Sequence, residues 1–473
     1  MTRAREALGE LWSQAAGDPA ALGRVTLSGA DPVLPSSFRI GTAAQASIAA
    51  AGLAAAELWR LRTGRAQAVA VDMRAAAIEF RSERYLRVDG KAPASLWDPI
   101  AGVYRAGDGR VVRLHTNFPH HRERIVALLG CADSRESVQA ALASWKSEDF
   151  ETKANEAGGV VSMMRSPAEW SAHPQSGALG RLPTFEIERI GDAPARSLGP
   201  IPGPAGRGAR PLSGVRVLDL TRIVAGPVCG RTLAAHGADV LRIASPSLPF
   251  IEWLVIDTGR GKRSAHVDLA TADGRAALTR LLAEADIFVQ GYRPGAIAAR
   301  GFSPEDAARI RPGLVYVSLS AYSHAGPWSG RRGFDSLVQT ATGFNHAEGQ
   351  AAGVDGPKEL PAQALDHGSG QLMAFAAMMA RARQAREGGS WHVRVSLAQT
   401  GRWIWDLGRV DGGLAAPDPT LDDVADRLEE SESAFGLLRA VRHAAELAET
   451  PAAFVLPASR LGAHRPHWDN LAQ

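Results

Sequence analysis

The chain has 473 residues, with 53 lysines and arginines against 50 acidic residues, and a hydrophobic content of 45%. This length predicts two or three globular units, and the composition is close to the average of folded soluble proteins. The arginines are scattered among acids, which argues against a nucleic-acid surface, where basic and aromatic side chains cluster.

The sequence also lacks the patterns of membrane-spanning, secreted, disulfide-linked and metal-cluster proteins. No apolar run reaches the roughly 18 residues of a membrane-spanning helix, and the opening residues lack the apolar core of a signal peptide. The two cysteines, Cys131 and Cys229, indicate neither a disulfide framework nor a metal cluster. We therefore expect a cytoplasmic protein that acts on small molecules, with no nucleic-acid or membrane partner.

The first half of the chain predicts two units of mixed structure. Residues 1–90 are expected to form a helical and strand segment that packs on a larger domain, with an alanine-rich helix at Ser37–Trp59 and an alternating strand at Ala68–Met73. Residues 91–197 predict a small α/β domain and a return segment. Its expected elements are a hairpin at Val103–Leu114 and helices at His120–Leu129, Ser134–Ala154 and Pro167–His173.

A proline- and glycine-rich stretch, Leu198–Gly214, predicts a linker. Strand and helix patterns then alternate through residues 215–412, which is typical of a parallel sheet covered by helices. The expected strands are Val215–Leu220, Val240–Ile243, Ile287–Gln290, Leu314–Leu319 and Trp391–Leu397, and the expected helices Gly226–His236, Gly274–Glu284 and Gly370–Arg386. Residues 413–473 predict a connector and tail, with a solvated acidic stretch at Asp418–Ser433.

One pattern occurs twice. The segments Ala50–Met73 and Ala374–Leu397 both have a helix of small residues, a basic end, a glycine turn and an alternating strand. Their identity is low, so the pattern alone leaves convergence and duplication both open.

The loop after the first strand of the second half is the first candidate site. A loop that leaves a parallel strand and opens a helix is a common ligand site. Here Ala225-Gly226-Pro227 stands where a dinucleotide-binding chain would have its glycine fingerprint, so NAD binding is not indicated. The alternative is a buried unit in which Gly226 and Pro227 only start a helix.

Cationic residues recur at strand ends, where guanidinium groups and backbone N–H groups suit a phosphate. They are Arg242, Arg260, Lys262, Arg263 and Arg293. Taken singly, each is also compatible with an ordinary surface position.

Asp366 precedes a long predicted helix and is followed by Gly368 and Gly370. It could cap that helix, or it could be an ionised nucleophile that a bulky substrate reaches across the glycines. Asp335 begins another apolar helix and leaves the same two interpretations. The histidines His324, His346, His367 and His392 have no metal-site spacing, so no metal is predicted.

Taken together, these segments resemble the class III CoA-transferases, the carnitine and bile-acid CoA-transferase group. The similarity is dense over Pro211–Leu407, and its segments are PLSGVRVLDLTRIVAGP, AAHGADVLRI, TGRGKRSAHVDL, ADIFVQGYRPGAIAARGF, RPGLVYVSLSAY, AGPWSGRRGFDSLVQTATG and ALDHGSG. The resemblance implies an α/β fold with a Rossmann-like, parallel-sheet CoA-binding domain plus a smaller α/β domain. It also implies a homodimer, interlocked in the family.

The resemblance also implies a chemistry. Asp366 falls on the family's catalytic aspartate, which attacks a donor thioester and then carries CoA as an aspartyl thioester. Asp335 matches an acidic position close to it. Val224, Ala225, Arg242, Lys262, Arg263, Arg293 and Arg300 match positions around CoA. No cofactor is permanently bound, and coenzyme A or acyl-CoA is the substrate.

The chain departs from the family pattern in several places. Leu96–His173 resembles the small domain but precedes the Rossmann-like half, so the order is permuted and the mode of dimerisation is open. Thr42 stands where a second copy of the aspartate would fall, which predicts an empty copy. Phe334 replaces a histidine of related racemases, and Val224 replaces a glutamine of oxalate-using relatives, which favours a less polar acyl group.

Three functions therefore remain in view. The first is CoA transfer between carboxylic acids. The second is α-methylacyl-CoA racemisation, which Phe334 disfavours because two-base proton exchange then lacks a partner. The third is a non-catalytic CoA-binding protein, which the permuted layout allows.

Overall fold

The computed structural model describes residues 2–93, 96–199 and 208–468. Its central element is a seven-stranded sheet of order β10-β9-β8-β11-β12-β13-β7, in which only β7 is antiparallel. The first six strands have the order of a Rossmann fold, which confirms the predicted α/β class. The strands are β7 (Phe185–Gly191), β8 (Arg216–Leu220), β9 (Asp239–Ala244), β10 (Lys262–His266), β11 (Ile287–Gln290), β12 (Val315–Ser320) and β13 (Ser390–Ser396).

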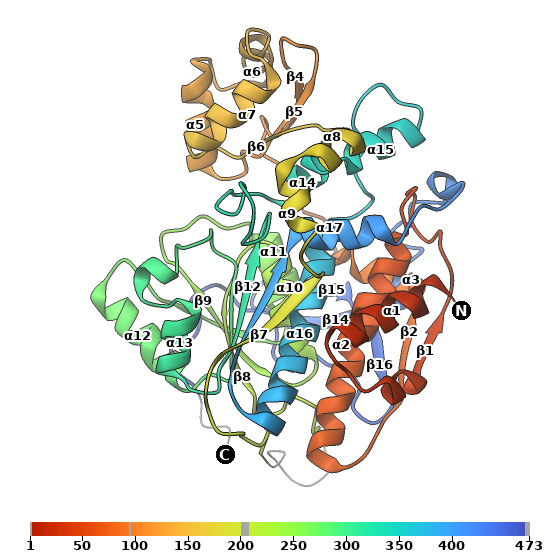
Figure 1. Cartoon of the computed structure of the whole chain (residues 1–473), viewed down its shortest axis with the longest axis vertical. Coiled ribbons are helices and arrows are strands. Elements are labelled where there is room, and N and C mark those ends of the chain that lie inside the picture. Colours follow the sequence, from red (N-terminus) through yellow and green to blue (C-terminus); the bar gives the residue numbers. More distant parts are fainter. Residues whose placement is uncertain (1, 94–95, 200–207, 469–473) are drawn as a thin grey trace.

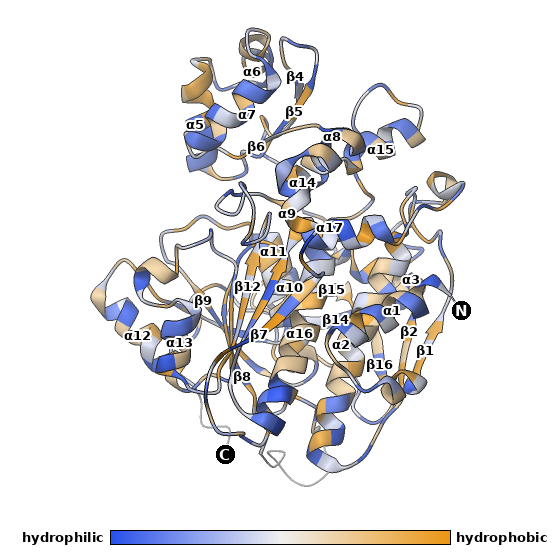
Figure 2. Ribbon diagram, in the orientation of Figure 1, coloured by the Kyte–Doolittle hydropathy of each residue, from blue (hydrophilic) through white to orange (hydrophobic). Residues whose placement is uncertain are grey.

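Both faces of this sheet are buried, because alternate residues of each strand enter different apolar clusters. Val217 and Val240 belong to the cluster that includes α16 (Ala364–Glu387) and α10 (Ala225–Ala235). Their neighbours Leu218 and Leu241 belong to the cluster under α12 (Ala272–Ala283) and α13 (Pro304–Ile310). The hydropathy colouring shows the strands as mostly hydrophobic and these outer helices as blue in part (Figure 2).

The first part of the chain adds a second layer of helices beside α16. Helix α2 (Ile40–Thr63) lies alongside α16, and α1 (Arg3–Gln14) covers both (Figure 1). Trp12 of α1 stacks on Phe375 of α16, with 5.9 Å between ring centroids. A small sheet of order β1-β2-β16 flanks α2, formed by β1 (Val25–Ser28), β2 (Val69–Asp72) and β16 (Ala445–Leu447).

The small domain stands beyond the carboxyl ends of the main sheet (Figure 1). Its three antiparallel strands, β4 (Gly102–Arg105), β5 (Val111–Leu114) and β6 (Val161–Met163), share an apolar core with α5 (Pro119–Leu129), α6 (Arg135–Leu142) and α7 (Ser147–Glu156). The chain returns through α8 (Pro167–Ala172) and α9 (Pro174–Leu179) to β7, which pairs with β13. The small domain is thereby joined to the large sheet through an edge strand.

The C-terminal residues are more structured than the acidic composition predicts. Leu428–Ser433, expected as part of a solvated connector, is strand β14. It pairs with β15 (Gly436–Val441), which pairs in turn with β3 (Arg87–Val88). Its pairing with β15 explains the difference: Leu428 is buried at the start of β14, Glu429 is half-buried, and Glu430 and Glu432 stay exposed. Of the predicted linker, residues 200–207 lie outside the described part of the chain.

The remaining helices are short. They are α3 (Met73–Glu79), α4 (Ser82–Tyr85), α11 (Glu252–Gly259), α14 (Asp335–Ala341), α15 (Phe344–Ala351) and α17 (Leu397–Asp406), with 3-10 turns at Pro19–Arg24, Ala298–Arg300, Gly413–Ala415 and Ala425–Arg427. Across the described residues, we find no helix with both the length and the apolar character needed to span a membrane.

Candidate active site

A groove of about 460 Å³ runs along the carboxyl ends of the parallel strands. Residues at strand ends line it, among them Leu220 at the end of β8, Ala244 at the end of β9 and Leu319 in β12. Phe118, from the small domain, lines the same groove, and so does Asp366 in the first turn of α16. Ligands of open α/β sheets bind at this edge, so the groove is the candidate site.

Asp366 is buried, with 6% of its surface exposed, and it occupies the third position of α16. The cap position of that helix is Gln363, whose side chain makes no capping bond. The capping interpretation of Asp366 is therefore wrong. Instead, the backbone N–H of Asp366 donates to Oδ2 of Asp335 over 2.9 Å. The structure brings together the two acids that the sequence singled out.

The pKa values of both carboxyl groups are higher than those of isolated acids. Burial raises the pKa of Asp335 to about 6, although hydrogen bonds from Asp366 N and from the Gln339 side chain oppose the shift. Burial, followed by the charges of Asp335 and Glu83, raises the pKa of Asp366 well above its ordinary value. Strongly perturbed carboxyl groups in a cleft are typical of functional sites.

Gly370 has a packing role that the sequence analysis did not predict. A Cβ on Gly370 would lie 2.6 Å from the carbonyl oxygen of Ala225 and 2.7 Å from the side chain of Val228. Gly370 therefore allows α10 to approach α16 closely, rather than opening a path for substrate. This approach brings Val224 and Ala225, both lining residues, next to the turn that carries Asp366.

The loop between β8 and α10 is strained at the groove. Ile223 has a φ of +73°, a conformation that a β-branched residue adopts only when its surroundings enforce it. Asp219 lies beneath the loop, accepts from the backbone N–H of Thr221 over 3.0 Å, and pairs with Lys262 over 2.8 Å. Lys262 also donates to the carbonyl oxygen of Pro227. These buried contacts hold the loop in shape.

The predicted cationic set divides into two groups. Arg293 and Arg300 line the groove as expected. Lys262 and Arg263 do not, because their charges are held by Asp219 and by Asp239, the latter at 2.8 Å. The prediction that they bind phosphate is not supported.

Two further predicted cations also lie away from the groove lining. Arg242 is buried in β9, with Nε and Nη1 lacking hydrogen-bond partners, while Arg260 is buried beside Asp257. Burial lowers the pKa of both guanidinium groups. Neither is among the described residues that line the groove.

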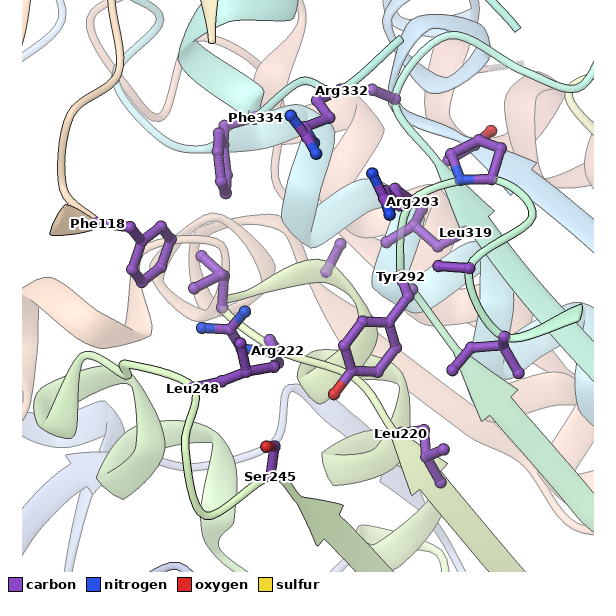
Figure 3. A pocket seen from close by; sticks show the side chains of 18 of the residues that line it. Phe118, Leu220, Arg222, Ser245, Leu248, Tyr292, Arg293, Leu319, Arg332 and Phe334 are labelled. Atoms are coloured by element: carbon purple, nitrogen blue, oxygen red, sulfur yellow. The ribbon is translucent and has the colours of Figure 1, made fainter. Parts of the chain in front are cut away.

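Three arginines that the sequence analysis did not single out also line the groove: Arg222, Arg331 and Arg332. Arg331 pairs with Glu151 over 2.8 Å. Arg222 and Arg332, like Arg293 and Arg300, form no ion pair within the described residues. Burial and then the neighbouring Arg293 lower the pKa of Arg332, which reflects positive charge without a local counterion. Figure 3 shows Arg222, Arg293 and Arg332 projecting into the hollow. Such a site attracts anions.

The first half of the chain reaches the active site through Glu83. Its Oε2 lies 3.0 Å from Nε2 of His367, the residue after the candidate nucleophile. Burial tends to raise the pKa of Glu83, but the charge of His367 and their hydrogen bond lower it overall. Ser82, the residue before Glu83, donates to Asp257, which pairs with buried Arg231. A buried polar network therefore joins α4 to the back of the site.

The groove also contains imidazoles. His120 and His121 line it, and His115 stacks on Phe334 with 3.8 Å between ring centroids. Burial lowers the pKa values of His115 and His121 to about 3. Such weak bases are poorly matched to removing a proton from carbon near neutral pH. These histidines therefore do not substitute for the basic histidine that related racemases have at the position of Phe334. Among the described residues, no three histidine, cysteine or acidic side chains gather as a metal site.

The chain belongs to CoA-transferase family III, whose profile matches residues 13–195 and 212–411. It is 29% identical over 325 residues to an acetyl-coenzyme A transferase of Hypoxylon pulicicidum, covering 64% of this chain and 54% of that protein. It is 32% identical over 183 residues to the succinyl-CoA:glutarate CoA-transferase of Mus musculus, covering 36% and 41%.

A solved structure from Mycobacterium tuberculosis, described as a hypothetical protein, is 32% identical, with a TM-score of 0.39. That alignment covers 42% of this chain and 58% of the other. The chain spans about half the length of the curated relatives it matches.

Proposed function

We propose that this protein is an acyl-CoA transferase that moves CoA between carboxylic acids through an aspartyl-CoA thioester on Asp366. The observation that carries the proposal is a buried carboxyl group in a groove with unpaired arginines. The arginines suit the phosphates of CoA, and a carboxylate that lines the same groove can attack a thioester bound there. No permanently bound cofactor takes part.

The reaction proceeds by successive acyl substitutions. The Asp366 carboxylate attacks the thioester carbonyl, so an anhydride forms and CoA leaves as a thiolate. The thiolate attacks the aspartyl carbonyl, which releases the donor acid and leaves CoA on Asp366. The acceptor carboxylate then attacks this aspartyl thioester, giving a new anhydride and free CoA thiolate. The thiolate attacks the acceptor acyl carbon, which restores Asp366 and forms the product thioester.

The neighbouring residues support this chemistry in distinct ways. Asp335 orients the first turn of α16 by accepting from Asp366 N. Its negative charge destabilises the ionised nucleophile, which makes Asp366 more reactive once it is deprotonated. Arg293 and Arg300 are proposed to hold CoA phosphates, while Val224 and Ala225 lie beside the pantetheine arm.

Replacing Asp366 with asparagine tests the proposal. Asparagine keeps the side-chain size but cannot form the anhydride, so CoA transfer should fall by several orders of magnitude while circular dichroism stays native. With wild type, acyl-CoA and no acceptor, rapid quenching and mass spectrometry should find CoA on the Asp366 peptide. Full activity of the variant would refute the mechanism, and an adduct on another residue would relocate it.

We also propose that the enzyme acts in the cytoplasm as a homodimer. The free cysteines, Cys131 and buried Cys229, suit a reducing compartment. The dimer is implied by the family resemblance. Light scattering on the full chain should give twice the 50.0 kDa mass of one chain. A monomeric mass with full CoA-transfer activity would remove the dimer from the proposal.

A further inference from the structure

Five aromatic rings gather beside the nucleophile. Phe118 and Phe334 lie 6.1 Å apart between centroids, and His121 lies 5.8 Å from Phe118 and 6.1 Å from Phe334. His115 stacks on Phe334, and His120 lies 4.2 Å from His121. Four of the rings come from the small domain, whereas Phe334 precedes Asp335. The cluster therefore forms only because the small domain docks over the groove.

The position of Phe334 connects the cluster to the reacting atoms. Its neighbour Asp335 accepts from the backbone of Asp366, so Phe334 stands one residue from a group that touches the nucleophile. Phe118, His121 and Phe334 line the same groove as Asp366. Figure 3 shows both phenylalanine rings on one side of the hollow, with Tyr292 and Leu319 opposite. The cluster thus forms part of the wall of the groove that contains Asp366.

The ring surface is uncharged. Burial lowers the pKa of His115 and of His121 to about 3, and burial with Arg124 and Arg222 lowers that of His120. The Nδ1 atoms of His115 and His121 are buried and lack hydrogen-bond partners. These imidazoles consequently present neutral aromatic faces and edges rather than positive charge. A second carboxylate on the acyl group would find no cation among them.

Positive charge lies at the border of the cluster instead. The Arg222 guanidinium is 5.1 Å from the centre of the Phe118 ring, and it donates to the carbonyl oxygen of Pro249. Arg332 donates to the carbonyl oxygen of Gly158 over 3.0 Å. Neither forms an ion pair within the described residues, so both can attract the carboxylate of an incoming acid. Rings then surround the remainder of that acid.

We propose that the preferred substrates are aryl-substituted carboxylic acids and their CoA thioesters, whose ring packs against the surface that Phe118 and Phe334 form together. Aromatic rings favour edge-to-face and offset contacts beyond what burial of apolar area supplies. The inference rests on the proposed CoA-transfer function and adds a substrate class to it.

The test compares acceptors that differ in one property. With acetyl-CoA as the donor, wild type should use phenylacetate with a kcat/KM about tenfold above that of cyclohexylacetate, its non-aromatic analogue. Glutarate should be poorer still. A kcat/KM for glutarate or cyclohexylacetate equal to or above that for phenylacetate would overturn the inference.

A double variant, Phe118→Leu with Phe334→Leu, keeps apolar volume but removes the ring faces. It should bring the ratio of phenylacetate to cyclohexylacetate close to one. Phe185→Leu is the matched control, because Phe185 is a buried ring in β7 that packs on Phe375 outside the groove lining. The control should keep the wild-type ratio. An unchanged ratio in the folded double variant would contradict the assignment.

Binding separates this inference from the proposed chemistry. Calorimetry with Asp366→Asn should give about tenfold tighter binding of phenylacetyl-CoA than of cyclohexylacetyl-CoA. Equal affinities for the two thioesters would refute the proposed substrate class, whatever the turnover. A clear aryl preference in binding, with no CoA transfer to any acid by wild type, would support the substrate class and defeat the transferase proposal.

Discussion

The two halves of the chain contain the same structural unit. Helices α2 and α16 each have 24 residues, and each is followed by a glycine at the C-cap, Gly64 and Gly388. Strand β2 has β1 as its parallel neighbour and β16 as its antiparallel one. Strand β13 has β12 and β7 in the same two relations. Shared length, capping and pairing favour duplication over the convergence that the sequence pattern left open.

The two units differ at the position of the candidate nucleophile. The third residue of α2 is Thr42, and the third residue of α16 is Asp366. The Thr42 backbone N–H donates to Asp31 Oδ2 over 3.0 Å, as Asp366 N donates to Asp335. The Thr42 hydroxyl also donates to Asp31, over 2.6 Å. The first unit thus has a carboxylate in the supporting position and a neutral hydroxyl where the second unit has the candidate nucleophile.

Making the second unit resemble the first should have the largest effect. Asp366→Thr removes the carboxylate but leaves a hydroxyl that can donate to Asp335, as Thr42 does to Asp31. The fold should therefore persist while CoA transfer falls by several orders of magnitude. Turnover measured beside the melting temperature checks this. Substantial activity in the threonine variant would mean that the two positions differ in something other than the nucleophile.

Removing the supporting carboxylate of the active unit should change the pH dependence. The charge of Asp335 helps to raise the pKa of Asp366, so Asp335→Asn should lower it. The nucleophile must be ionised, so kcat/KM rises with pH through its apparent pKa, and this limb should move to lower pH in the variant. We expect turnover at neutral pH to fall about tenfold, because a less basic carboxylate is a weaker nucleophile.

The control for this profile is Asp355→Asn, because the Asp355 side chain is 96% exposed. It should leave the acid limb in place. A limb that stays unmoved in Asp335→Asn would show that Asp335 does not influence the ionisation of Asp366.

The reverse substitution should affect stability rather than activity. Thr42→Asp places a buried carboxyl group against Asp31, so about 2 kcal/mol of the free energy of unfolding should be lost at neutral pH. The folded-state pKa of the introduced acid would be raised by burial and like charge. The loss should therefore shrink as the pH falls toward about 4 and vanish below it, where the unfolded state also binds the proton. Thr42→Ser, which keeps the hydroxyl, should lose far less in denaturant titrations at both pH values.

The smallest effect tests the contribution of the first half to the second. Glu83 also raises the pKa of Asp366, as the weaker of the two charges. Glu83→Gln should move the acid limb of kcat/KM to lower pH by less than Asp335→Asn does. Glu57→Gln, on α2 and paired with Arg24 and Arg60, is the control and should not move it. A displacement in the control would trace the effect to general loosening of the first half.

The sequence was informative where a property is local. Buried parallel strands are short apolar runs, so most of the main sheet was predictable. Asp366 and Asp335 were identified as acids at helix starts, and the family resemblance distinguished nucleophile from cap. Arg222 follows a strand as Arg293 does, so the same signal could have identified it.

Other features depend on tertiary contacts that no local pattern contains. Lys262 and Arg263 have the spacing of phosphate ligands, but Asp219 and Asp239, which neutralise them, come from neighbouring strands. Glu83 approaches His367 across 284 positions of sequence. Phe118 reaches the groove through docking of the small domain. Partners so distant in sequence are set by packing rather than by spacing.

The edge strand β7 has a consequence for how the protein is made. Gly191 pairs with Ser390, so at about 5–20 residues per second the ribosome releases β7 roughly 10–40 seconds before its partner strand exists. During that interval the strand offers unpaired backbone groups to any other nascent chain. Glu186 and Glu188 alternate with Phe185 and Ile187, and Arg189 follows; charges of this kind discourage pairing with other chains. The charged side chains of β7 thus protect it from pairing with other chains until β13 has been synthesised.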